Sequence, residues 1–87
     1  MFFSDIKTCL FQTIYMDDLK MAISILNCGF NIEARDQYDR TPLMVSMMLQ
    51  NSEFILLFLS RGANENAIDY RNNGMDYYKN ILNIKNK

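Results

Sequence analysis

Blocks of apolar and polar residues alternate through the middle of the chain and predict two helices joined by a tight turn. The first helix begins at Pro42, where a missing N–H costs nothing, directly after Thr41, a favourable N-cap. It ends near Leu49, because the Gln, Asn and Ser that follow at 50–52 favour caps and turns. The Asn or the Ser then caps a mainly apolar second helix at 53–59, which returns antiparallel to the first.

The same pattern recurs with a period of 33 residues. Gly29 and Gly62 each close a helix in the left-handed conformation that glycine adopts at low cost, and Asn, Ala and Asp recur after both in register. A fixed period of this size predicts stacked helix-turn-helix units, each of which buries its apolar face against its neighbours. We therefore expect Leu26 and Leu59 to occupy equivalent, neighbouring positions.

The period divides the chain into two repeats and a partial third, at about 4–35, 36–68 and 69–87. The helices predicted for the outer units span about Ser4–Tyr15, Asp18–Asn27 and Met75–Ile84. The polar segments between units predict extended, hairpin-like loops, which we call the first finger (29–39) and the second finger (62–73). Either Asn72 or Gly74 takes the turn position of the second finger.

The stretch DQYDRTPL at 36–43, followed by RGAN at 61–64, resembles an ankyrin repeat. Residues 18–36 resemble the second half of another such repeat, so that the likeness covers nearly the whole chain. This resemblance implies an all-α fold, in which an ankyrin-type helix-turn-helix solenoid carries β-hairpin-like finger loops. It also implies that residues 1–87 form a single domain.

Three positions depart from the ankyrin pattern. Met44 stands where the family usually has His, which removes the hydrogen bonds that this His makes to neighbouring loops. Ser46 and Met47 replace a pair of small alanines, so packing between helices is expected to be looser or adjusted there. Asp39 replaces a finger glycine, and we expect it to adopt a left-handed backbone because aspartate tolerates that conformation better than most residues.

The resemblance further implies a small protein–protein interaction module, because ankyrin arrays bind partners through the finger tips and the exposed side of the first helix. The residues at those positions are Gln37, Tyr38, Arg40, Met48, Leu49, Tyr70, Arg71 and Asn73. Tyr15 and Met16 align with the same helix end in the first unit. Two alternatives stay open: the finger tyrosines stiffen their turns, and the apolar helix ends pack on neighbouring fingers instead of facing a partner.

The composition limits the core and assigns the sulfur-containing residues to it. Eighty-seven residues, 49% of them hydrophobic, allow one domain of marginal stability. Met21, Met44 and Met47 are expected to fill gaps in the core. Cys9 and Cys28 are expected to be small buried hydrophobes that stay reduced, because no secretory signal is visible and the chain is predicted to be intracellular, most simply cytoplasmic.

The residue inventory argues against several classes of function. A net charge of -1 disfavours nucleic acid, and a chain with two Cys and no His cannot assemble the usual zinc site. The longest apolar run, 54–59, is far shorter than the ~20 residues that cross a bilayer. Asp17 and Asp18 form a helix-capping arrangement, not an acid/base pair. We therefore predict no catalytic residue, no cofactor and no membrane contact.

A second interpretation is that the chain is a remnant of a longer array, with no dedicated partner and stabilised by self-association. The partial third unit would then leave apolar residues covered on one side only: Met75, Tyr78, Ile81 and Leu82. The richness in Asn, Ile, Lys and Tyr is typical of A+T-rich genomes, such as those of large DNA viruses and intracellular bacteria. This composition is compatible with a host-interaction protein acting in the host cytoplasm.

Overall fold

The computed structural model describes the backbone of residues 6–85 and the side chains of residues 7–80. Within these bounds the chain is all-α, as predicted, and no residue forms a strand. The helices are α1 (Ile6–Tyr15), α2 (Leu19–Asn27), α3 (Pro42–Met48), α4 (Ser52–Ser60) and α5 (Met75–Lys85). Their ends lie within two residues of the predicted ends, apart from the predicted start of the first helix, which lies outside the described residues.

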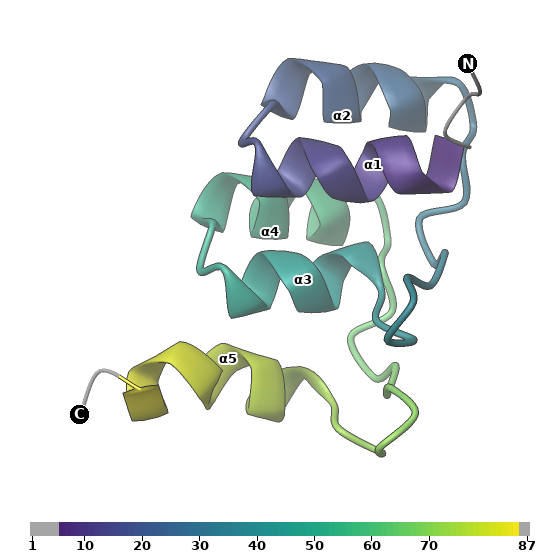
Figure 1. Ribbon diagram of the computed structural model, residues 1–87. Helices are drawn as coiled ribbons and strands as arrows, with labels where there is room; N and C mark the ends of the chain where they lie inside the picture. The colour runs from purple at the N-terminus through teal and green to yellow at the C-terminus, as the bar shows by residue number, and fades with distance from the viewer. Residues whose placement is uncertain (1–5, 86–87) are drawn as a thin grey trace.

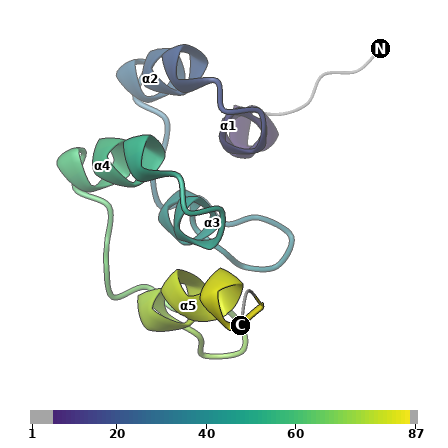
Figure 2. The same cartoon turned by 90° about the vertical axis from the view of Figure 1, so that its left-hand side faces the viewer.

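The helices form two layers (Figures 1 and 2). The end-on view shows α1, α3 and α5 in one layer and α2 and α4 in the other. The central helix α3 packs against α1, α4 and α5, and α2 packs against α4. The successive pairs therefore lie side by side along a molecule whose longest dimension is 40 Å (Figure 1).

The backbone repeats with the period seen in the sequence. Three pairs of residues with positive φ are each separated by 33 positions: Asp17 (59°) and Gln50 (57°), Gly29 (89°) and Gly62 (84°), Asp39 (63°) and Asn72 (69°). The predicted left-handed conformation of Asp39 is confirmed, and Asn72 rather than Gly74 takes the turn position of the second finger. The fingers turn back on themselves as loops, without strands between residues 6 and 85.

Polar side chains cap the helices and tie neighbouring units together. The Asn51 side chain accepts a hydrogen bond from the Phe54 amide at 3.3 Å and is therefore the N-cap of α4. Its amide group also donates to the Asp17 carboxylate at 2.8 Å, which links the turn between α1 and α2 to the start of α4. Thr41 caps α3, and its own N–H donates to the Met44 sulfur at 3.4 Å, so this methionine closes a capping box.

The core lies between the two layers. Leu10, Val45, Phe54 and Phe58 are fully buried, and the two phenylalanine rings are 5.9 Å apart. Leu26 and Leu59 hold equivalent places, since the carbonyl of each accepts the amide of the glycine that closes its helix, at 2.9 and 3.0 Å. Leu26 is buried, whereas Leu59 on the last helix of its layer is half-buried.

Several predictions about burial are wrong. Met44 and Met47 are buried as expected, but Met21 is 51% exposed, because Ala22, Ile25 and Leu26 form the buried face of α2. Cys28 is exposed because it follows the last residue of α2, and Cys9 is half-buried.

The third unit also differs from the expectation of a helix covered on one side only. Tyr78 is 4% exposed, because α5 packs under α3 and the tyrosine hydroxyl donates to the Asp69 carboxylate. Met75 is half-buried. The side chains of Ile81 and Leu82 lie outside the described residues.

Candidate partner-binding groove

The first finger is closed by a carboxylate that bonds to its own backbone. Asp36 Oδ1 accepts from the amides of Tyr38 (2.9 Å) and Arg40 (2.8 Å). The Asp36 amide in turn donates to the Arg40 carbonyl at 2.9 Å, which the positive φ of Asp39 makes possible. Tyr38 is thereby held at the tip of a rigid turn.

The second finger repeats this construction one period later. Asp69 Oδ1 accepts from the amides of Arg71 (2.8 Å) and Asn73 (2.9 Å), and the Asp69 amide donates to the Asn73 carbonyl at 2.9 Å. Asp69 Oδ2 accepts from the Asn73 side chain at 3.4 Å and from the Tyr78 hydroxyl. Arg71 takes the place that Tyr38 has in the first finger, and Tyr70, one residue earlier, takes the place of Gln37.

These hydrogen bonds decide the ionisation of the buried pair. Burial alone would raise the pKa of Asp69, but the hydrogen bonds from Tyr78 and from the Asn73 and Arg71 amides outweigh it and lower the pKa below its usual value. Burial and the adjacent carboxylate together raise the pKa of Tyr78 well above its usual value. Asp69 is therefore ionised and Tyr78 is neutral at physiological pH.

Arg40 joins the first finger to two helices. Its guanidinium donates to Asp36 Oδ2 (3.0 Å), to the Met48 sulfur (3.2 Å) and to the Tyr15 hydroxyl (3.2 Å), and it lies 4.7 Å from the centre of the Tyr38 ring. Burial alone would lower the pKa of Arg40, but the bond to Asp36 and its charge outweigh burial and raise it. The cation is therefore permanent and holds its neighbours at fixed positions.

Two further contacts fix the fingers to each other. Arg35 donates to its own finger at the Asp39 carbonyl (2.8 Å) and to the second finger at the Ile68 carbonyl (2.6 Å). Glu33 Oε2 accepts from the Asn64 amide at 2.7 Å. The two fingers are thus held together by hydrogen bonds between side chains of the first finger and the backbone of the second.

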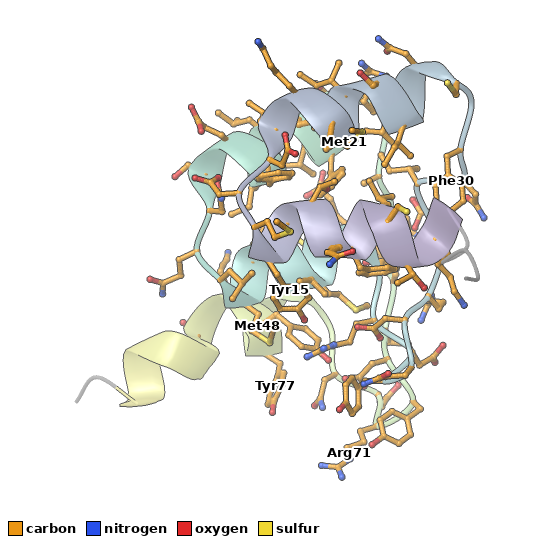
Figure 3. All side chains as sticks on the ribbon, turned by 45° about the horizontal axis from the view of Figure 1, so that its top comes forward. Tyr15, Met21, Phe30, Met48, Arg71 and Tyr77 are labelled. Atoms are coloured by element: carbon orange, nitrogen blue, oxygen red, sulfur yellow. The ribbon has the colours of Figure 1, made fainter. Side chains whose placement is uncertain are left out.

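The fingers and the first-layer helices enclose two adjoining open grooves, which together we call the finger groove. The larger, of about 1000 Å³, is lined by Lys7, Thr8, Phe11, Gln12, Tyr15, Asp36, Gln37, Tyr38 and Arg40. The smaller is lined by Tyr38, Arg40, Met48, Asp69, Tyr70, Arg71, Asn73, Tyr77 and Tyr78. Figure 3 shows Tyr15, Met48, Tyr77 and Arg71 along this side of the molecule and Met21 beyond α1, on α2.

Seven of the eight residues predicted to bind a partner line the finger groove, and Leu49 does not. Their role in binding stays a prediction. The apolar helix ends do not all follow one alternative. Met48 and Tyr15 contact Arg40 at the base of the first finger, although Tyr15 is still 51% exposed, whereas Met16 and Leu49 are 67% and 37% exposed.

The sequence analysis missed several residues of the groove. Lys7, Phe11 and Tyr15 follow one another at intervals of four along α1, and Gln12 lies beside them. Residues four apart share a face of a helix, so this spacing could have identified the groove side of α1 from Tyr15 alone. Tyr77 near the start of α5 was missed as well, and no helical spacing links it to a predicted residue, because Asn73 lies in the second finger outside the helix.

Tyrosines are concentrated in the groove. The chain has five tyrosines, and all of them line it. Four are exposed: Tyr15 (51%), Tyr38 (48%), Tyr70 (63%) and Tyr77 (44%). A tyrosine offers a large contact area at low entropic cost, and it is enriched where proteins grip one another. Exposed tyrosines gathered in this way are typical of surfaces that contact other proteins.

The groove offers little for chemistry. Its two carboxylates, those of Asp36 and Asp69, are both engaged by the hydrogen bonds described above. Within residues 6–85 no cluster of three or more His, Cys, Asp or Glu residues is placed to hold a metal ion. In the same part of the chain, no helix is long and apolar enough to cross a membrane.

Comparison with known proteins gives a partial match. No family model matches the chain. It is 36% identical over 47 residues to the "Ankyrin repeat, SAM and basic leucine zipper domain-containing protein 1" of Notamacropus eugenii, and 35% identical over 49 residues to that of Carollia perspicillata. The matches cover 54% and 56% of this chain but 10% of each relative. About half of the chain is therefore similar to a protein that contains ankyrin repeats.

Proposed function

We propose that the chain is a short ankyrin-repeat array that works as a non-catalytic protein-binding module inside a cell, most simply in the cytoplasm, and that it holds its partner in the finger groove. The observation that carries this proposal is the gathering of all five tyrosines in the finger groove, two of them on loops fixed by Asp36, Asp69 and Arg35 and three on α1 and α5. A rigid surface pays little entropy on binding, which favours partner recognition. The partial similarity to a protein with ankyrin repeats supports the same function.

Affinity capture from a cell lysate tests the proposal. The bait is the chain carrying Tyr38→Ala and Tyr70→Ala, which removes the two exposed finger rings without touching the carboxylates that close the fingers. The matched control is Met21→Ala with Leu56→Ala, since both are exposed apolar residues of the second layer (51% and 67%). We expect the tyrosine variant to lose the partners and the control to keep them. Equal capture by both folded variants would refute the proposal.

A second candidate is the remnant of a longer array that associates with itself. It is favoured by the apolar surface of α4, where Leu56 is 67% exposed and Ile55 and Leu59 are half-buried. Light scattering over a range of concentrations separates the two. If the mass rises with concentration and Leu56→Lys abolishes the rise, self-association is real. A constant monomer mass excludes it.

A further inference from the structure

The acidic groups of the finger groove are less accessible to a ligand than its basic groups. Its two carboxylates are turned into the fingers: Asp69 is 6% exposed and the Asp36 side chain 13% exposed. Both accept hydrogen bonds from nearby backbone amides and from side chains, Arg40 for Asp36, and Asn73 and Tyr78 for Asp69. Neither is free to meet a ligand, although both count in the net charge of the chain.

The free charges of the groove are cationic. Lys7 is exposed in the larger groove and Arg71 in the smaller one. Arg71 lies 5.4 Å from the centre of the Tyr70 ring, and among residues 6–85 neither its guanidinium nor the Lys7 amine has a hydrogen bond or an ion pair. Three cations and two carboxylates line the groove, so the groove is positive by one charge although the chain as a whole carries -1. Such a local field attracts and orients a ligand of the opposite sign.

We propose that the partner segment held in the finger groove is an extended acidic stretch of protein, with carboxylates that meet Lys7 and Arg71 and apolar side chains that pack on the tyrosines between them. This inference rests on the proposed function and names the chemistry of the partner. Arg71 is suited to the task, since its planar guanidinium can bind a carboxylate through two hydrogen bonds while it stacks on Tyr70.

Single-stranded nucleic acid fits the groove less well. Exposed aromatic rings could stack with bases, as in other single-strand binders. Such binding also needs a positively charged groove that follows the phosphates of the backbone. Within the described part of the chain, the groove has two cations without a charged partner, too few for a strand that carries one phosphate per nucleotide. A peptide with two carboxylates would pair with both of them.

A peptide-display selection on the immobilised chain tests the proposal. Peptides enriched from a random library are made with a fluorescent label, and their affinity is measured by fluorescence polarisation. We expect Asp and Glu to be enriched in the selected sequences, and we expect replacement of these residues by Asn and Gln to weaken binding about tenfold, the combined effect of two exposed ion pairs. A labelled oligouridine serves as the nucleic-acid probe and should not bind at physiological salt.

Charge reversal locates the binding site. Lys7→Glu with Arg71→Glu should weaken the selected peptide by tenfold or more, and the neutral Lys7→Gln, Arg71→Gln pair should weaken it less. The control is Lys20→Glu with Lys79→Glu, which makes the same change in net charge at exposed residues outside the groove. Circular dichroism checks that every variant keeps its fold.

The outcomes separate this inference from the proposed function. Selected peptides without acidic residues, which bind the Lys7 and Arg71 variants normally but not Tyr38→Ala with Tyr70→Ala, would overturn the acidic partner and leave the groove as the binding site. Oligouridine that binds and is lost with the same tyrosines would overturn it in favour of nucleic acid. A selection that enriches no peptide would overturn the inference. Peptides that bind every variant equally would overturn it too, and they would also count against the groove as the binding site.

Discussion

Asp69→Asn tests the buried carboxylate that holds the second finger to α5. The amide has nearly the same shape, and its oxygen can still accept from the Arg71 and Asn73 amides, but the charge is lost from all four hydrogen bonds. Its NH₂ group would take the place of Oδ2 and would therefore face two donors, the Asn73 side chain and the Tyr78 hydroxyl. Hydrogen bonds to a charged group contribute about 1 kcal/mol more than neutral ones, so the four bonds together would lose about 4 kcal/mol. The variant no longer buries a charge, which offsets part of this loss, and we expect a net loss of about 2 kcal/mol in the free energy of unfolding.

Thermal and urea unfolding measure this loss. For a domain of this size, 2 kcal/mol corresponds to a fall in Tm of roughly 8–16 °C. Glu65→Gln is the matched control, because it removes the same charge from an exposed side chain of the same finger and should change stability by less than about 0.5 kcal/mol. Tyr78→Phe removes only the buried hydroxyl and should cost about 1–2 kcal/mol.

A double-mutant cycle decides whether the two side chains act together. Because the Tyr78 hydroxyl donates to Asp69, the double variant should lose less stability than the two single losses combined, with a coupling of about 1 kcal/mol. Additive losses would show that the hydrogen bond contributes nothing. Asp69→Asn with the Tm of the wild type would refute the account of the second finger.

The other predictions concern pH, backbone and core. Because folding lowers the pKa of Asp69, its ionised carboxylate contributes fully to stability above the unfolded pKa of about 3.9, and this contribution is lost as the pH falls through the folded pKa. The Tm of the wild type should therefore drop more than that of Asp69→Asn between about pH 5 and pH 3. Gly62→Ala should cost about 1 kcal/mol because φ is 84°, whereas Gly74→Ala, with no positive φ and ordinary contacts at 3.7 Å, should change the free energy of unfolding little. Leu10→Ala in the core should cost about 2–5 kcal/mol of the free energy of unfolding, and Leu56→Ala, at a residue that is 67% exposed, less than about 0.5 kcal/mol, both measured by urea denaturation. Equal losses for the two glycine variants would contradict the assigned backbone conformation, and equal losses for the two leucine variants would contradict the assigned burial.

The helices are readable from the sequence because their ends depend on local chemistry. Thr41 and Pro42 start α3 through interactions within one turn, and Gly62 closes α4 through its own backbone conformation. The period of 33 residues then places equivalent positions without any knowledge of tertiary contacts. Burial is harder to predict from the sequence. The sequence analysis expected Met21 in the core, although it lies exposed on α2, and it did not foresee that the packing of α5 on α3 buries Tyr78.

The sequence predicts most of the residues that form the groove but not the hydrogen bonds that connect them. The alignment of repeats brings Tyr38 and Tyr70 to the tips of the two fingers, one residue out of register, because the two fingers are built in the same way. The role of Arg40 depends on Tyr15, which lies 25 residues earlier in the chain and meets the guanidinium only after α1 packs on α3. The hydrogen bond from the Tyr78 hydroxyl to Asp69 is a tertiary contact of the same kind, and no local sequence pattern predicts it.

The central claim is that a protein partner occupies the finger groove. The most direct measurement is an NMR titration of the labelled chain with the partner retained by affinity capture, following the backbone amide signals. We predict that the largest shifts fall on residues 36–40 and 69–73 and on the groove side of α1. Shifts confined to the outward faces of α2 and α4, with unchanged finger signals, would contradict the claim.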